Sequence, residues 1–323
     1  MKRINNLHGK RLLAFLIEKL RKHPDVVGVT TSRRIRDGKE LAEECITIFV
    51  KAKVHTELLP AQRKLPRYFN LRNKDGSIDR TKRIYTDIIQ IGQVKSIAAG
   101  GSGIIVLGEN GTITMAFQTD GDQFLLSNRH VLAPHIDQQQ AVVQIRDDSG
   151  LVSVATLNSY FQTEQENGKE FIDAGLAKVE ASSQTLIQIY AIKNGASSLS
   201  IKKMRTLKSR ETGNFWFSGS QSGVRSGTIM DILVGGGAWK VEYAHLGVIL
   251  VDRLYALKVS AIQGDSGAPV YETSSDGTAT LVGIVVATAQ DNNTGTNLVL
   301  FHSIVDVENG FKRLLKKQTF SFL

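Results

Sequence analysis

The chain has very little cysteine, because Cys45 is the only one among its 323 residues. A single thiol cannot form a disulfide within the chain. Hydrophobic residues make up 41% of the sequence, which is ample for a core. Cys45 lies in an apolar, strand-like pattern with no histidine beside it in the sequence, which argues against a catalytic thiol.

Long hydrophobic runs are also missing, and none approaches the length of a membrane span. The start of the chain is basic, but its apolar stretch from Leu12 to Ile17 is short and is followed by charged residues. This pattern is typical of an amphipathic helix and not of a secretory signal. Together with the lack of disulfides, it predicts a cytoplasmic protein without a membrane partner.

Signatures of nucleic-acid, metal and cofactor binding are missing as well. The net charge is +9, but the basic residues are scattered and lack an RNA-binding motif, zinc spacing or a helix-turn-helix signature. They are interpreted as solvated faces, so a nucleic-acid partner is not expected, while an acidic protein partner stays open. His135, His245 and His302 lack the spacing of metal ligands, and the glycines at 235–237 indicate a hairpin tip. We therefore expect no metal and no cofactor.

The most informative segment that is present is the hexapeptide Gly264–Pro269, which reads GDSGAP. A serine hydroxyl needs a neighbouring base and donors aimed at the oxyanion that it creates. Gly264 allows a tight turn in which its N–H and that of Ser266 point into one small pocket. Gly267 removes side-chain bulk where a substrate approaches, and Pro269 stiffens the exit into the next strand. An ordinary turn between two strands is the alternative for this hexapeptide alone.

Two further segments supply partners for this serine. An apolar run from Phe124 onward ends in His130, and Asp173 is followed by small and apolar residues that run into a strand. The three segments resemble those of trypsin-like serine proteases, in the chymotrypsin order of His, Asp and Ser. An α/β-hydrolase would need its acid and histidine after the serine. Asp291 and His302 do follow it, but too little chain remains to complete that sheet.

The resemblance covers roughly residues 95–323 and implies a mainly β fold, a chymotrypsin-like double β-barrel. The segment 100–106 resembles the first hairpin of the N-terminal barrel, and 218–229 resembles the strands that open the second barrel in bacterial members. The segment 281–287 is similar to the strand that lines the substrate cleft, and 305–317 is expected to be the final helix.

Residues 1–94 are expected to form a separate, small α+β domain with a regulatory role. The pattern predicts a helix over 8–23, strands over 26–32 and 44–54 joined through Asp37-Gly38, and a strand over 86–92. A loop marked by Pro60 and Pro66 separates the last two strands. The arrangement resembles the module before the protease domain in the plant narrow-leaf protease and many bacterial relatives.

The resemblance implies a serine endopeptidase acting through an acyl-enzyme. Ser266 attacks the carbonyl, His130 takes and returns the proton, Asp173 orients the imidazole, and the N–H groups of Gly264 and Ser266 hold the oxyanion. A protein or peptide would be the substrate, and a regulatory protein partner stays open. Two alternatives remain, a protease-fold scaffold that binds peptides with little turnover and an esterase on the same site.

The primary specificity pocket follows from the same resemblance. Ser260, six residues before the nucleophile, would lie at its base without a charge. The strand 283–288, with Ala287 and Thr288 at its end, would form one wall, where Thr288 narrows the entrance. A small or medium uncharged residue is expected before the cleaved bond. His302 is the alternative, because near the pocket it would favour an acidic side chain.

Overall fold

The computed structural model describes residues 15–20, 22–36, 39–50, 52–54, 59–72, 78–90, 95–96, 102–107, 109–135, 140–147, 150–162, 171–195, 197–208, 211, 213–230, 237–291, 294–317 and 319–323. They are mainly β-strands, arranged in a seven-stranded and a fourteen-stranded sheet. The expected mainly β fold with two β lobes, as in a chymotrypsin-like double β-barrel, is confirmed.

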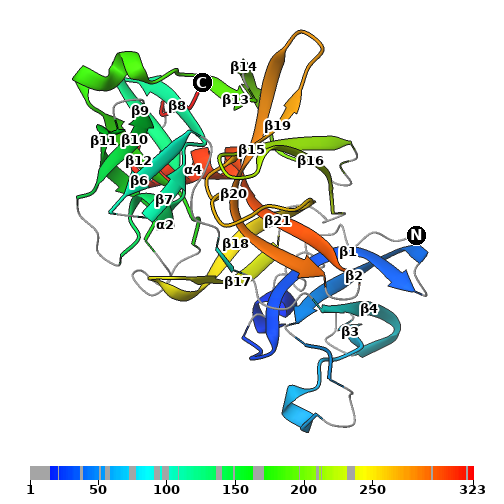
Figure 1. Cartoon of the computed structure of the whole chain (residues 1–323). Coiled ribbons are helices and arrows are strands. Elements are labelled where there is room, and N and C mark those ends of the chain that lie inside the picture. The colour runs from blue at the N-terminus through cyan, green and yellow to red at the C-terminus, as the bar shows by residue number, and fades with distance from the viewer. Residues whose placement is uncertain are drawn as a thin grey trace.

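The seven-stranded sheet forms the first lobe (Figure 1), in the order β7-β6-β10-β11-β12-β9-β8. All its neighbouring strands are antiparallel, and the expected first hairpin is present as β6 and β7. A one-turn helix, α2 (Arg129–Leu132), directly follows β9. The strands are β6 (Gly103–Val106), β7 (Glu109–Thr112), β8 (Met115–Thr119), β9 (Asp122–Ser127), β10 (Val142–Asp147), β11 (Gly150–Tyr160) and β12 (Gly175–Val179).

The fourteen-stranded sheet contains the second lobe and extends into the N-terminal strands. The expected hairpin at 218–229 is β15 and β16, and the expected cleft strand lies within β20. Two 3-10 turns, η2 (Ala61–Arg63) and η3 (Ala181–Leu186), connect strands. The strands of this lobe are β13 (Ala191–Asn194), β14 (Ser197–Met204), β15 (Asn214–Gly219), β16 (Gly223–Ile229), β17 (Gly237–Tyr243), β18 (Gly247–Lys258), β19 (Pro269–Thr273), β20 (Thr278–Asp291) and β21 (Thr296–Ser303).

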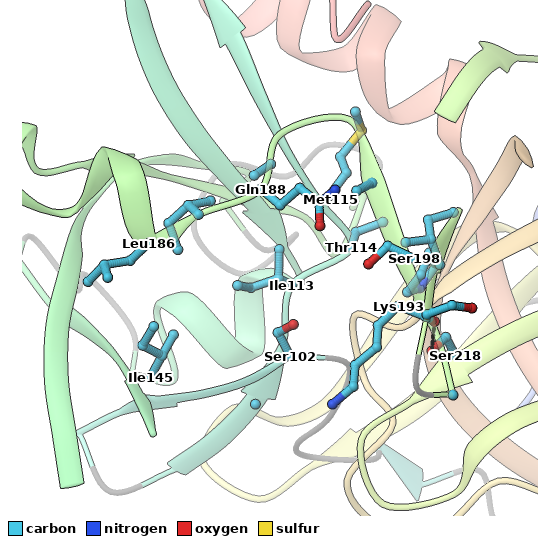
Figure 2. Close-up of a pocket in the computed structure, with 18 residues that line it drawn as sticks. Ser102, Ile113, Thr114, Met115, Ile145, Leu186, Gln188, Lys193, Ser198 and Ser218 are labelled. Atoms are coloured by element: carbon cyan, nitrogen blue, oxygen red, sulfur yellow. Dashed lines mark hydrogen bonds between the residues drawn. The ribbon is translucent and has the colours of Figure 1, made fainter. Parts of the chain in front are cut away.

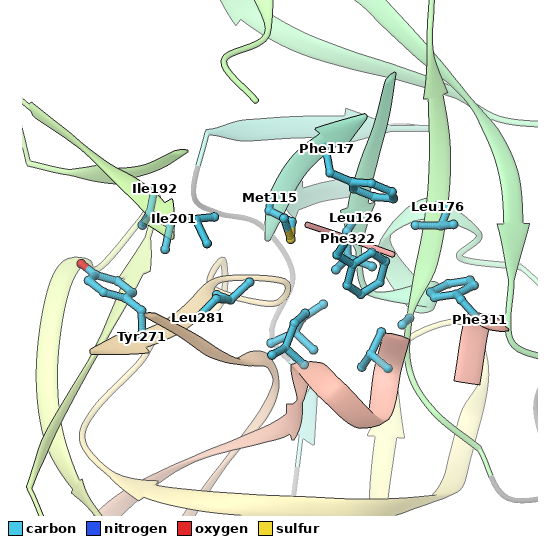
Figure 3. Packing of buried hydrophobic residues seen from close by; sticks show 14 of the residues in the cluster. Met115, Phe117, Leu126, Leu176, Ile192, Ile201, Tyr271, Leu281, Phe311 and Phe322 are labelled. Atoms are coloured by element: carbon cyan, nitrogen blue, oxygen red, sulfur yellow. The ribbon is translucent and has the colours of Figure 1, made fainter. Parts of the chain in front are cut away.

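The two lobes share one hydrophobic core beside the last helix, α4 (Ile304–Leu314). Figure 3 shows side chains from both lobes and from α4 meeting there. The buried residues of α4 recur at helical spacing, so they form one face. Lys312 and Arg313 lie in its last turn, where positive charges interact favourably with the negative end of the helix dipole. The buried members include Met115, Phe117, Leu126, Leu176, Ile201, Tyr271, Leu281, Phe311 and Phe322. This core fixes how the lobes face each other.

The N-terminal strands continue the second sheet through β17, as Figure 1 shows at its lower right. Gly28 pairs with Trp239, and a Cβ at position 28 would lie only 2.9 Å from the indole. Phe49 stacks on the same indole with ring centroids 4.3 Å apart. The strands are β1 (Val26–Arg36), β2 (Lys39–Val50), β3 (Tyr68–Arg72) and β4 (Ile78–Gln90). This module therefore shares both hydrogen bonds and core with the second lobe.

Most predicted elements are found with shifted ends. The helix predicted over 8–23 is described only at 15–20, and Pro24 disfavours helical backbone at the residue before it. The predicted last helix ends at Leu314, and Lys316 takes a left-handed φ of 53°. The turn at Asp37-Gly38 and the glycines at 235–236 lie outside the described residues. The division of the chain at residue 94 stays a prediction.

Candidate active site

His130 lies in α2, which directly follows the buried end of β9. Its side chain is nearly buried, with 8% of the residue exposed. Asn128, which precedes the helix, donates its side-chain N–H to the Asp173 carbonyl over 2.9 Å. The bond joins the start of α2 to the segment that contains Asp173. The two segments are neighbours because β9, which precedes α2, pairs with β12, which follows Asp173.

Asp173 and His130 form a buried pair. The His130 Nδ1 lies 2.6 Å from the Asp173 Oδ2, and the backbone N–H of His130 donates to Oδ1 over 3.1 Å. Burial alone would raise the pKa of Asp173, but the charge and the hydrogen bonds of His130 outweigh it and hold the pKa below its usual value. An ionised carboxylate only accepts, so Nδ1 carries the proton and Nε2 is left as the acceptor. The structure therefore brings together two of the three predicted residues in the tautomer that a general base requires.

The loop of the predicted nucleophile, residues 264–269 (the nucleophile loop), is held between the two lobes. Thr112 of the first lobe donates its N–H to the Ser266 carbonyl over 3.0 Å, and the Thr114 hydroxyl donates to the Gly267 carbonyl over 2.7 Å. From the other side, the Gly267 N–H donates to the Val285 carbonyl over 2.8 Å. The backbone of the predicted nucleophile is thus fixed at the lobe interface.

The structure gives two reasons for a glycine at position 267. Gly267 has a φ of +87°, and a Cβ there would overlap the Thr112 carbonyl and the Ser127 hydroxyl. The position is therefore constrained by packing against the first lobe and by its left-handed backbone, while the predicted role in the approach of a substrate stays a prediction. Pro269 begins β19, as expected.

The Ser266 side chain is fully buried, and its hydroxyl donates to the Val286 carbonyl over 3.3 Å. Within the described part of the chain, the Ser266 hydroxyl is bonded to Val286 and not to the His130 ring. The N–H groups of Gly264 and Ser266, predicted to hold the oxyanion, donate to no other described residue. Gly264 has a φ of +128°, a backbone conformation that favours glycine.

Asp265, beside the nucleophile, has a fully buried carboxylate held by uncharged donors. It accepts from the hydroxyl and, over 3.2 Å, the N–H of Ser222, and from the N–H of Ile262 over 3.1 Å. Gly219 leaves room for this carboxylate, because a Cβ at that position would overlap it. The bonds connect the nucleophile loop to the turn between β15 and β16.

The residues predicted for the specificity pocket are placed differently from one another. Ser260 is exposed and accepts from the Asn297 side chain over 2.8 Å. Ala287 is fully buried and packs in the core of the second lobe. Thr288 is half-buried. A short strand, β5 (Lys95–Ser96), pairs its backbone antiparallel to Ala287 and Thr288, so this edge is covered by the chain itself.

His302 contacts Asp173 directly, a contact that the sequence did not indicate. The Asp173 N–H donates to the His302 Nε2 over 2.9 Å, and the ring is fully buried. Burial lowers the pKa of His302 to about 4, so the ring is neutral near pH 7. A neutral ring engaged with a backbone amide does not favour an acidic substrate side chain, which removes the basis for that alternative.

A cavity of about 480 Å³ is lined by residues of both lobes, among them Met115 from the first and Lys193 from the second (Figure 2). Thr114, which holds the Gly267 carbonyl, forms part of its wall, and Pro269 lines it as well. Lys193, Ser102 and Ser218 give it a polar character. The predicted triad residues do not line this cavity.

Among the described residues, no group of three or more His, Cys, Asp or Glu side chains could hold a metal ion. None of the helices in the described part of the chain combines the length and apolar character that a membrane crossing needs.

Solved structures similar to this chain are serine proteases. One is a glutamic-acid-specific serine protease that uses a histidine triad in substrate binding, with 14% identity and a TM-score of 0.48 over 66% of this chain and 97% of that one. Thermobifida fusca protease A and Nocardiopsis protease each show 16% identity and a TM-score of 0.46 over 66% of this chain, and over 95% and 96% of their own. No protein-family model and no curated protein matches the sequence. At these identities the similarity is one of fold.

Proposed function

We propose that this protein is a serine endopeptidase in which Ser266 is the nucleophile, His130 the general base and Asp173 the residue that orients it. The observation that supports this most strongly is the buried His130–Asp173 pair, in which Nδ1 lies 2.6 Å from Oδ2 and the His130 backbone N–H donates to Oδ1 over 3.1 Å. Such a pair has the geometry of a base prepared to take a proton from a hydroxyl.

In the reaction, the Ser266 hydroxyl leaves the Val286 carbonyl, donates to the His130 Nε2 and attacks the substrate carbonyl carbon. The proton passes to His130, whose positive charge is stabilised by Asp173. The tetrahedral oxyanion accepts from the N–H groups of Gly264 and Ser266. The intermediate then collapses to an acyl-enzyme as His130 protonates the leaving amine, and water releases the acid by the same steps in reverse.

The alternative of a peptide-binding scaffold with little turnover is favoured by one observation, the buried Ser266 hydroxyl on Val286. The deciding experiment measures hydrolysis of an amide-bond peptide library and of matched esters by wild type, Ser266→Ala and the exposed control Ser274→Ala. The proposal expects peptide turnover in wild type and Ser274→Ala, and none in Ser266→Ala. Binding without turnover supports the scaffold, and turnover of esters alone supports the esterase.

The substrate is proposed to be a cytoplasmic protein or peptide with a small or medium uncharged residue before the cleaved bond. Thr288 supports this, because its branched side chain stands half-buried on the strand after Val286. In the library, Thr288→Gly is expected to improve cleavage after larger residues roughly tenfold. Dominant cleavage after Arg, Lys or Glu by wild type would contradict the pocket.

The module of residues 1–94 is proposed to regulate the peptidase. The support is its contact with β17, where Gly28 pairs with Trp239 and Phe49 stacks on the same ring. Deleting residues 1–94 is expected to change turnover, stability or oligomeric state, measured by peptide hydrolysis, thermal unfolding and light scattering. A truncated protein equal to the full chain in all three would refute a regulatory role.

A further inference from the structure

Tyr243 lies at the end of β17, and its hydroxyl reaches the buried carboxylate of Asp173. The hydroxyl donates to Oδ2 over 2.9 Å, and the tyrosine ring lies against the His130 imidazole with centroids 4.8 Å apart. Only 2% of the residue is exposed. The two residues are 70 positions apart and come from different lobes.

The oxygen that accepts from Tyr243 is the one that faces the base. Oδ2 receives the Tyr243 hydroxyl and the His130 Nδ1–H, whereas Oδ1 receives the His130 backbone N–H. A second donor on a carboxylate oxygen draws charge from it and fixes its position, and inside a protein this effect is stronger than in water. The hydroxyl therefore acts on the same hydrogen bond that orients the imidazole.

The Tyr243 hydroxyl stays protonated and can therefore donate at all times. Burial first, and then the charge and hydrogen bond of Asp173, raise the pKa of Tyr243 well above its usual value. The hydroxyl thus keeps its proton throughout the pH range in which a peptidase works. The other charged or titratable groups around this carboxylate are His302, which accepts the Asp173 N–H, and the side chains of Arg129 and Arg253 near the tyrosine and His302.

We infer that Tyr243 is a positioning residue of the triad, holding the Asp173 carboxylate in place and moderating its hydrogen bond to His130. The inference rests on the proposed peptidase function for its role in turnover. The hydrogen-bond coupling itself needs only the folded protein. Because Tyr243 belongs to the second lobe, its hydrogen bond also connects the Asp–His pair of the first lobe to the lobe that carries Ser266.

The test replaces Tyr243 with Phe, which keeps the ring on His130 and removes only the donor. Tyr271→Phe is the matched control, because Tyr271 is also fully buried but its hydroxyl lies 3.5 Å from the Asn194 side chain, in the core between the lobes. Proton NMR of the His130 Nδ1–H is recorded in a Ser266→Ala background, so that no turnover is required. The Nδ1–H resonance is expected to move downfield in Tyr243→Phe and to stay in place in Tyr271→Phe, because Oδ2 keeps His130 as its remaining strong donor.

The kinetic part uses wild-type Ser266 and a peptide substrate. Tyr243→Phe is expected to lower kcat roughly tenfold with KM nearly unchanged, and to move the acidic limb of the kcat/KM profile to higher pH. An unchanged Nδ1–H resonance together with an unchanged profile overturns the inference. A shifted resonance in a protein without peptidase activity contradicts the proposed function and leaves the coupling intact.

A second variant covers the case in which Tyr243→Phe does not fold. Difluorotyrosine placed at position 243 keeps the shape of the residue and makes its hydroxyl a stronger donor. The Nδ1–H resonance is then expected to move in the opposite direction, upfield, because Oδ2 is left less basic. A shift in the downfield direction, or none, overturns the inference.

Discussion

The two halves of the candidate active site are prepared to different degrees. Around Asp173, the side chains of Asn128, His130, Tyr243 and His302 all bond either the carboxylate or its backbone. Around Ser266, the backbone is held by Thr112, while the hydroxyl donates to the Val286 carbonyl. The proposed base and the acid that orients it are thus fixed by several hydrogen bonds, whereas the hydroxyl of the proposed nucleophile is bonded to a backbone carbonyl.

The difference follows from where the halves come from. His130 and Asp173 follow and precede paired strands, β9 and β12, of the same sheet. Ser266 belongs to the other lobe, and its loop is bonded to the first lobe through Thr112 and Thr114. Backbone pairing fixes the first half locally, while the second depends on bonds between lobes.

The largest effect is expected from removing the charge of Asp173. Asp173→Asn keeps the size of the side chain but removes the charge and favours the wrong imidazole tautomer. We expect kcat for peptide hydrolysis to fall by about four orders of magnitude. The control is Asp276→Asn, an exposed turn residue bonded to Thr278, which is expected to retain full activity. Equal rates in both variants would show that the Asp173 half is not part of the machinery.

Gly267→Ala breaks the support of the nucleophile half. The new methyl group would overlap the Thr112 carbonyl at a left-handed φ, so we expect turnover to fall more than about a hundredfold and stability to fall by about 3 kcal/mol or more. Gly277→Ala is the matched control, with a φ of +76° and open space around it, and should cost about 1 kcal/mol without loss of turnover. Urea unfolding and peptide hydrolysis of both variants measure the difference, which a similar loss in the two would contradict.

His302, which lies beside Asp173, should also make the stability of the protein depend on pH. The pKa of His302 is lowered from 6.5 to about 4 in the folded protein, so between these values the unfolded chain binds a proton that the folded protein does not. Stability is therefore complete above pH 6.5 and falls as the pH drops towards 4, by about 3 kcal/mol from this group. In His302→Gln this part of the loss should vanish, whereas the exposed control His135→Gln should keep it. Urea unfolding at pH 7 and pH 4.5 decides, and identical losses in both variants would refute the assignment.

The smallest effect is expected at the anchor of the nucleophile loop. Ser222→Ala removes the hydroxyl donor from the buried Asp265 carboxylate and leaves the backbone N–H groups of residues 222 and 262, so stability should fall by about 2 kcal/mol and turnover roughly tenfold. Ser220→Ala, an exposed residue of the same turn, should be close to wild type. If Ser222→Ala were as stable and active as Ser220→Ala, the loop would not depend on this anchor.

The sequence predicted the parts of this site that lie in continuous motifs. The segments around His130, Asp173 and Ser266 each have a local pattern, and their order selects one fold. The supporting residues have none, because Tyr243, His302 and Ser222 lie 70, 129 and 43 positions from the partners that they bond. Only the folded sheets bring these side chains together.

The face that each residue of the predicted pocket strand takes could not be predicted, for a related reason. The strand 283–288 was assigned to the pocket wall from its resemblance, and along a strand successive side chains point to opposite faces. In the structure the Ala287 side chain faces the core, while the neighbouring Thr288 is half-buried. A resemblance in sequence does not establish which face each residue takes.

The most direct test of the account is covalent labelling of the full chain with a fluorophosphonate, which reacts only with activated serines, followed by peptide mapping with mass spectrometry. Ser266 is predicted to carry the phosphonyl group in wild type, and labelling is predicted to be lost in His130→Ala, which keeps the hydroxyl but removes the base. Undiminished labelling of Ser266 in His130→Ala, labelling at another residue, or a wild-type protein that takes up no probe would contradict the claim that His130 activates Ser266.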